Sequence, residues 1–356
     1  MKDKHMHIQA DSILLKQLHT AIDQKLHIDP KSTAFLLTMK FVFYFILMAA
    51  TYAMIFLTHQ PVVLITAFIL YGLLSVLLGF NFAHDFSHNT VFKSKSLNNF
   101  CFVSIYTLLG AHAEAWKYRH IHSHHYAPNV HDYDSDLQIT SLIRVEPTGP
   151  YKWFHRFQHF YAPIAYTSYS LYWVLIKDFV IYFKENDNPQ KQKLVYHISF
   201  WSQKIIYFSY LLVLPIRFST FTWYWVAGSF VAMHLLQSLF LLFTFFMTHH
   251  VEETEYFGVD EDGFIQTSWL INQIKSSNDF YPFSKTANFI FGGFNNHVAH
   301  HLFPHIHHVH YPELNKILYG ILNEHDIIPN VTSFTGGVVS HLRHLRNLSV
   351  SPARFC

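Results

Sequence analysis

Two long apolar runs separated by only three residues constrain the fold of this chain more than any other feature. Residues 34–57 and 61–80 are each long enough to cross a bilayer, which takes about 20 helical residues. Thr58, His59 and Gln60 leave room only for a tight hairpin between them. Only 13% of the residues are charged and 51% are hydrophobic, whereas a soluble domain is about 25% charged. The sequence therefore predicts an all-α membrane protein.

Two further apolar runs, residues 205–220 and 223–246, predict a second hairpin and four transmembrane helices in all. The stretch 160–174 is rich in Tyr, Ser and Trp and predicts an interfacial amphipathic helix instead. Lysines flank the first run on its N-terminal side, so the positive-inside tendency places both termini in the cytoplasm. We expect a cytosolic N-terminal segment over 1–33, a catalytic domain over 34–318 and a cytosolic tail over 319–356.

Histidine boxes beside these runs carry the functional signal. Nine of the 29 histidines fall into three boxes and one isolated position, namely His84 and His88; His120, His124 and His125; His249; and His297, His300 and His301. Helical spacings of three and four residues put the imidazoles of each box on one face, so each box is predicted to aim at one point. One zinc ion uses about four ligands, and nine histidines therefore suit two ions. Two nitrogen-ligated metals at a membrane surface indicate oxygen chemistry on a lipid.

Several function classes are disfavoured by the same sequence. A net charge of +2 without a basic stripe predicts no nucleic-acid partner. Cys101 and Cys356 are too few for a zinc ribbon or a disulfide framework, and we expect reduced thiols. No glycine fingerprint for a flavin or nicotinamide and no haem-binding His-Pro-Gly-Gly is present. Electrons for any redox reaction are therefore expected from a separate donor.

The boxes and their surroundings resemble the integral-membrane fatty acid desaturase family, whose signature is HxxxH, Hxx(x)HH and (H/Q)xxHH. The resemblance covers residues 80–318. Segments 154–163, 251–254, 292–295, 300–304 and 310–312 are similar to the linoleoyl-CoA or front-end branch. His297 departs from that branch, which usually carries glutamine there. The resemblance implies four transmembrane helices with a cytosolic helical cap, and a di-iron site whose ligands are the nine histidines.

The implied reaction introduces a cis double bond into a fatty acyl chain, carried by a lipid or by coenzyme A, with O2 as co-substrate. A ferredoxin or a cytochrome b5 is the implied electron donor. An acyl, alkane or carotenoid hydroxylase or ketolase of the same superfamily is the alternative, because it begins with the same hydrogen abstraction. A histidine-rich metal transporter or sensor is more remote. It predicts polar residues within the spans, where only His234 and Gln237 stand out.

Residues around the boxes are assigned more open roles. Five acids are predicted either to orient metal-bound imidazoles or to be solvated loop acids: Asp85, Asp132, Asp134, Asp136 and Glu252. Three tryptophans could line an acyl tunnel or anchor the membrane interface: Trp116, Trp153 and Trp269. His250 could exchange roles with His249. The cluster His305, His307, His308 and His310 is predicted to lie outside the ligand set, and His122 to be either solvent-exposed or a support for the ligands. Solvent exposure is expected for His5, His7, His19, His27, His341 and His344.

Overall fold

The computed structural model describes residues 4–138, 140–184 and 188–350, so the predicted thiol of Cys356 lies outside the described residues. Internal contacts divide the chain into two compact units, which are considered separately. Unit 1 comprises Met1–Asp29, Arg119–Ala162 and Phe243–Cys356. Unit 2 comprises Pro30–Tyr118 and Pro163–Leu242. Helices α7 and α12 each begin in one unit and end in the other.

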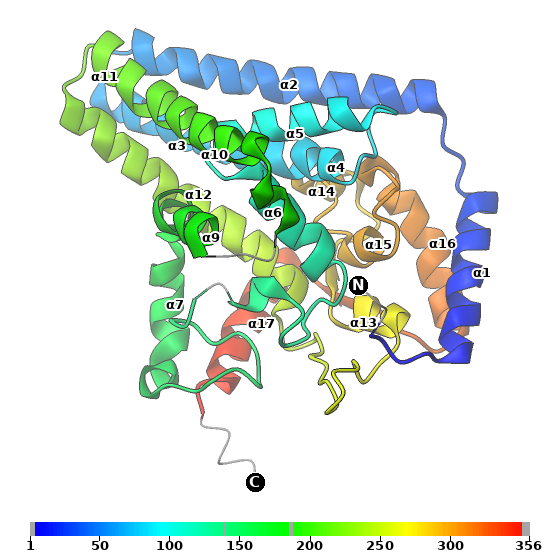
Figure 1. The fold of residues 1–356 in the computed structure, drawn as a ribbon. Helices are drawn as coiled ribbons and strands as arrows, with labels where there is room; N and C mark the ends of the chain where they lie inside the picture. The colour runs from blue at the N-terminus through cyan, green and yellow to red at the C-terminus, as the bar shows by residue number, and fades with distance from the viewer. Residues whose placement is uncertain (1–3, 139, 185–187, 351–356) are drawn as a thin grey trace. The chain divides into compact units, whose positions relative to one another are not determined.

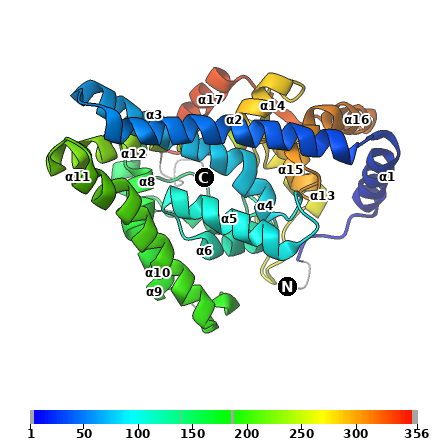
Figure 2. The same cartoon turned by 90° about the horizontal axis from the view of Figure 1, so that it is seen from above.

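Unit 2 is built from apolar helices. Its elements are α2 (Pro30–Leu57), α3 (Pro61–Leu78), the π-turn η1 (Gly79–Ala83), α4 (His84–Ser87), α5 (Lys95–Leu109), α6 (Ala113–Arg119), α8 (Tyr169–Tyr172), the π-turn η5 (Trp173–Lys177), α9 (Asp178–Lys184), the 3-10 turn η6 (Pro189–Gln192), α10 (Leu194–Phe208), the π-turn η7 (Ser209–Val213), α11 (Leu214–Phe218) and most of α12 (Trp223–His249). Pro61 opens α3, where its missing N–H costs nothing. Figure 2 shows α2 and α3 lying along each other, as the predicted hairpin requires.

Three helices of the described chain are long and apolar enough to cross a membrane: Pro30–Leu57, Pro61–Ser87 and Trp223–His249. They match three of the four predicted spans. The predicted fourth span, 205–220, is helical as far as Phe218 but consists of the end of α10, a π-turn and α11. Lys204 and Gln203 are buried just before it, and this polar start shortens the apolar stretch. The second span continues through η1 into α4, which confirms that the first histidine box extends a spanning helix.

One of the two polar side chains that stood out in the last span, His234, has a hydrogen-bond partner for each ring nitrogen. His234 is buried, its Nδ1 lies 2.7 Å from Ser170 Oγ and its Nε2 lies 2.8 Å from Tyr207 Oη. Ser170 Oγ also lies 2.7 Å from Ser238 Oγ. Intramembrane polar groups often mark a transport path, but these groups bond to one another within unit 2. They therefore hold helices together and give no support to a transporter.

Unit 1 carries most of the histidines on shorter elements. These are α1 (Gln9–Lys25), the π-turn η2 (His120–His124), the 3-10 turns η3 (Ser135–Gln138) and η4 (Trp153–Phe157), α7 (Gln158–Tyr166), the end of α12, α13 (Trp269–Lys275), β1 (Asn278–Phe280), α14 (Lys285–Phe291), α15 (His297–Leu302), the 3-10 turn η8 (His308–His310), α16 (Tyr311–Glu324), β2 (Asn330–Thr332) and α17 (Phe334–Asn347). Strands β1 and β2 form a short parallel pair. Serine side chains cap α13, α14 and α17, satisfying N–H groups that have no helical partner.

The core of unit 1 lies behind the third histidine box. Helix α1 turns Leu14, Leu18 and Ile22 inward, onto apolar residues of α13, α15 and α16. Figure 1 shows these four helices gathered together. The polar N-terminal segment of the sequence analysis thus contains an amphipathic helix. Its apolar stripe at i, i+4 and i+8 packs on α13 and α16 and joins the core that also contains residues of α15, so the N-terminal segment supports the third box through this shared core.

Candidate metal centre

Four buried histidines from three segments of unit 1 converge on one point. They are His124 from η2, His249 from the end of α12, and His297 and His301 from α15. One ligand nitrogen from each lies within 4.8 Å of the others. The Nε2 atom of His249 lies 2.7 Å from Nε2 of His297 and 3.2 Å from Nε2 of His301. We call this group the first histidine set.

Outer hydrogen bonds fix which nitrogen keeps its lone pair in three of the four rings. His249 Nδ1 donates to the carbonyl of Ser276 at 2.9 Å, and His301 Nδ1 donates to Gln273 Oε1 at 2.8 Å. His124 Nδ1 bonds to the Asp134 carboxylate at 3.1 Å, and its buried Nε2 has no hydrogen-bond partner. The inward Nε2 atoms of His124, His249 and His301 therefore present lone pairs to one another, which is repulsive without a cation. Histidine ligands of metals are held by outer partners in this way, so the donor set fits a metal ion.

The surroundings of the set shift the pKa values of His301 and His124 in opposite directions. Burial lowers the pKa of His301 well below its ordinary value, and neighbouring histidines lower it further, which keeps the ring neutral. Burial also acts to lower the pKa of His124, but Asp134 and then Asp136 outweigh it, so the net shift is upward. A metal requires a neutral imidazole. The carboxylate next to His124 thus makes that ring more basic than His301.

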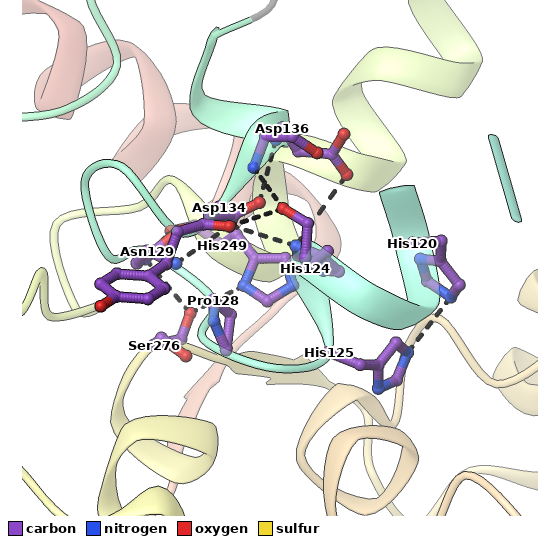
Figure 3. Close-up of polar contacts among 12 residues, drawn as sticks. His120, His124, His125, Pro128, Asn129, Asp134, Asp136, His249 and Ser276 are labelled. Carbon is purple, nitrogen blue, oxygen red and sulfur yellow. Dashed lines mark hydrogen bonds and ion pairs between the residues drawn. The ribbon is translucent and has the colours of Figure 1, made fainter. Parts of the chain in front are cut away.

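A second histidine set is formed within unit 1 by His120, His125 and His300. Their ligand nitrogens also lie within 4.8 Å of one another, and the Nε2 atoms of His120 and His125 are 3.1 Å apart (Figure 3). The π-turn η2 brings these two rings together, because its hydrogen bond joins His125 N to His120 O at 2.9 Å. Five-residue turns of this kind are frequent at functional sites. A metal ion held by these three histidines would still have open ligand positions, which no other histidine of the second and third boxes fills.

The first box lies in unit 2. His84 opens α4 and His88 follows its last residue, and their ring centroids are 5.3 Å apart. Trp116 of α6 packs edge-on against His84, with ring centroids 6.3 Å apart. The pair therefore faces one side of its helix, as its spacing predicts.

The prediction that each box aims at one point is wrong for the second and third boxes. His120 and His125 join one set, whereas His124 joins the other. In α15, His297 and His301 join the first set and His300 the second. The physical reason is angular. Adjacent helical residues point about 100° apart, so an HH pair cannot serve one point, but it can serve two neighbouring points.

The end of α12 is held by side chains from four separate segments. Asn278 Nδ2 donates to Met247 O, and Asn129 Nδ2 and Thr254 Oγ1 donate to His249 O, each at 2.8 Å. His341 Nδ1 donates to His250 O at 2.7 Å. The last carbonyls of a helix have no partner within it. These bonds satisfy them at the turn that carries His249, and Asn129 appears at this junction in Figure 3.

Helix α17 is part of this support, which the sequence did not suggest. His341 and His344 were predicted to be solvent-exposed, but both are buried, and so is His5. His344 Nε2 donates to the carbonyl of Val145 at 2.7 Å, and His5 Nε2 lies 3.3 Å from Asn272 Oδ1. His341 stacks on Phe246 with ring centroids 4.9 Å apart. Their spacing in a weakly apolar helix gave no sign that they face the core.

The third box is anchored by a buried acid that the sequence analysis did not name. Asp279 of β1 accepts hydrogen bonds from Val298 N at 2.9 Å and from Tyr319 Oη at 2.8 Å. Burial raises the pKa of Asp279 to about 7, and these hydrogen bonds act in the opposite direction. The carboxylate accepts a hydrogen bond from the first turn of α15, where backbone N–H groups have no partner within the helix. It therefore fixes where the helix of the third box begins.

The other residues that the sequence singled out fall into two groups, those beside the histidine sets and those away from them. Asp134 and Asp136 lie beside His124, whereas exposed Asp132 approaches His131 and exposed Glu252 bonds to Asn347. His250 bonds to Tyr256 Oη at 2.8 Å and belongs to neither histidine set. His122 is exposed, which is one of its two predicted states, and His7 and His27 are exposed as predicted. Trp153 is exposed on unit 1, which disfavours a tunnel position, and Trp269 packs on the unit 1 core.

We expect Asp134→Asn to weaken metal binding by about 10- to 100-fold, because partners that orient a ligand imidazole carry that much affinity. The variant removes the charge that holds His124 Nδ1 and keeps the size of the side chain. Metal content after dialysis against graded chelator is the measurement. Asp132→Asn is the matched control, since its side chain is 70% exposed and approaches only His131. Equal metal retention by the two variants would show that Asp134 does not orient a ligand.

Comparison with known proteins agrees with the histidine-rich site. The family model described as fatty acid desaturase matches residues 59–333. An acyl-lipid (8-3)-desaturase of Physcomitrium patens is 29% identical over 314 residues, which cover 86% of this chain and 65% of that protein. An sn-1 linoleoyl-lipid 6-desaturase of Arthrospira platensis is 28% identical over 283 residues, covering 77% and 75%. Delta(5) fatty acid desaturase A of Dictyostelium discoideum is 28% identical over 303 residues, covering 80% and 63%.

The alignments thus span slightly less than two thirds of the moss and Dictyostelium proteins. The family match, in contrast, covers most of this chain and includes all three histidine boxes and His249. The buried histidine sets are consistent with metal binding, and the spanning helices with a membrane protein. The chain belongs to the fatty acid desaturase family.

Proposed function

We propose that this protein is a membrane fatty acid desaturase that uses O2 to introduce a cis double bond into a fatty acyl chain. The observation that carries the proposal is the pair of histidine sets in unit 1, in which the ligand nitrogens of buried rings converge to within 4.8 Å of one another. All-nitrogen donor sets of this kind suit iron. The relatives are named for desaturation of acyl lipids, and a lipid-linked acyl chain is accordingly the proposed substrate, with acyl-CoA as the other possible carrier.

Two iron ions are proposed as the resident metals. His124, His249, His297 and His301 would hold one of them, and His120, His125 and His300 would hold the other. His84 and His88 of the first box are proposed as further iron ligands. This assignment follows the family pattern and the incomplete second set. When bound, the metals would supply the activation of O2 and the removal of hydrogen from an unactivated methylene. The protein would supply rigid ligand placement and the exclusion of water.

The chain's own contribution to rigidity is specific. The hydrogen bonds from His249 to Ser276 and from His301 to Gln273 fix two tautomers before a metal binds. Asp134 fixes a third and adds charge next to the first set. Pre-oriented ligands lose little conformational freedom on binding, so affinity is retained. The lowered pKa of His301 keeps this buried ring neutral, so protons do not compete with the metal for its nitrogen.

The overall reaction balances only with an external reductant. A saturated –CH2–CH2– unit, one O2, two electrons and two protons give –CH=CH– and two molecules of water. A ferredoxin or a cytochrome b5 is the proposed donor. We further propose four transmembrane helices in two hairpins, with 205–220 as the fourth span, and a cytoplasmic location for both termini and the histidine boxes.

Expression of the chain in a host that makes no polyunsaturated fatty acids of its own and is supplied with linoleic acid tests the function. We expect a new unsaturated fatty acid in the methyl-ester profile, and none from a His124→Ala variant that inserts equally well in the membrane. The loss is expected because removal of one of four ligands opens the first set. A hydroxylated acid in place of the alkene would instead support the hydroxylase alternative. An unchanged profile, with the iron-loaded protein present and a reductant supplied, would contradict both.

A further inference from the structure

The segment that joins the two units shows an inverted arrangement of polar and apolar side chains. It runs without a break from η4 into α7, and its part in unit 1 covers residues 153–162. Trp153 is 72% exposed, Phe160 is 70% exposed and Phe157 is 43% exposed. Phe157 and Phe160, three residues apart, lie on one side of the helical segment, and Trp153 is exposed in the 3-10 turn that precedes α7. We call these three side chains, with Lys152 and Arg156, the aromatic face.

The opposite side of the same segment is polar and buried. His155 Nε2 donates to Ser141 O at 3.0 Å. Gln158 is fully buried, and its Nε2 donates to the carbonyls of Arg144 and Leu345 at 3.0 and 2.9 Å. A water-exposed amphipathic helix shows the reverse pattern, with apolar residues inside. In this segment the polar groups form hydrogen bonds inside the protein. The apolar side chains therefore point away from the protein surface, toward its surroundings.

The charged side chains along this segment have one sign. Residues 150–166 contain Lys152 and Arg156 and no Asp or Glu. The Arg156 guanidinium lies 4.5 Å from the centre of the Phe157 ring, which keeps the cation at the edge of the aromatic patch. Arg346 of α17 is also exposed, and its positive charge adds to burial in lowering the pKa of His159. Trp and Phe combined with Lys and Arg on a surface helix are typical of segments that lie in a membrane interface.

We propose that the aromatic face is a membrane-docking surface of unit 1, and that its occupant is the headgroup region of a bilayer rich in anionic phospholipid. Trp153, Phe157 and Phe160 enter the boundary between headgroups and acyl chains. Lys152 and Arg156 bind the lipid phosphates. This inference goes beyond the proposed function, because it depends on neither the metals nor the reaction.

The test uses the full-length protein in bilayers of phosphatidylcholine, with and without phosphatidylglycerol, and brominated phosphatidylcholine as quencher. The contribution of Trp153 is isolated as the difference between the wild type and Trp153→Phe. Trp269→Phe is the control, since Trp269 packs on the unit 1 core. We expect Trp153 to be quenched about twofold or more strongly than Trp269. Metal-free protein should behave identically, which separates this result from failure of the proposed function.

The anionic preference is tested with Lys152→Gln/Arg156→Gln. Each cation near an anionic surface shifts a docking equilibrium by about fivefold, so phosphatidylglycerol should deepen the quenching of Trp153 in the wild type but not in the double variant. Equal quenching of Trp153 and Trp269 in both bilayers would overturn the proposal. It would also be overturned if Trp153 responded only to added cytochrome b5 or ferredoxin, because the face would then dock a protein.

Discussion

His301→Ala should abolish metal binding at the first histidine set and reduce desaturation by more than about 100-fold, beyond the 10- to 100-fold typical of outer partners. His301 is fully enclosed, and its Nε2 lies 3.2 Å from Nε2 of His249. Its Nδ1 is already committed to Gln273. No neighbouring side chain in the set can replace the lost nitrogen, since the other three rings are held by their own segments. Iron per chain and unsaturated product are the measurements.

The control is His305→Ala, which removes an exposed histidine four residues along the same chain. It should retain wild-type iron and product. Both variants should also elute as monodisperse membrane protein, which separates loss of a ligand from loss of the fold. A His301→Ala protein that kept two irons and full activity would remove this residue from the ligand set and would disprove the first set as a metal site.

Substitutions at His297 should separate a direct ligand from a supporting side chain. We expect His297→Gln to stay within about tenfold of the wild type, because an amide oxygen can coordinate iron and the branch that this chain resembles usually carries glutamine there. His297→Ala should lose more than about 100-fold, because nothing reaches the vacated position. The 2.7 Å separation between Nε2 of His297 and Nε2 of His249 supports a direct role. Iron content and product should be measured for both variants.

The comparison between the two substitutions is more informative than either alone. If His297 only supported the site, glutamine would have no special advantage over alanine as a ligand. The two variants would then differ only through the volume of the side chain that is lost. Near-normal iron and activity in the alanine variant would exclude His297 as a ligand. A glutamine variant as weak as the alanine variant would indicate that only imidazole fits the first set.

The sequence by itself determined the class of the protein and most of its site. Long apolar runs require helices in a membrane, because an unsatisfied backbone in lipid is costly. Three of the predicted spans are present. Histidines at helical spacing beside those runs indicated metal ligands, and seven of the nine lie in the two converging sets of unit 1. These features are local in sequence, so periodicity and residue type were enough to identify them.

Only the tertiary structure decided how the ligands are divided and what holds them. The π-turn at His120 pairs residues five apart and sends His124 to the other set, which an ideal helix would not predict. His341 and Asp279 support the site from segments far along the chain. Such partners are chosen by long-range packing, and isolated histidines or acids in the sequence carry no periodic signal for it. The burial of His155 and Gln158, opposite the aromatic face, was hidden for the same reason.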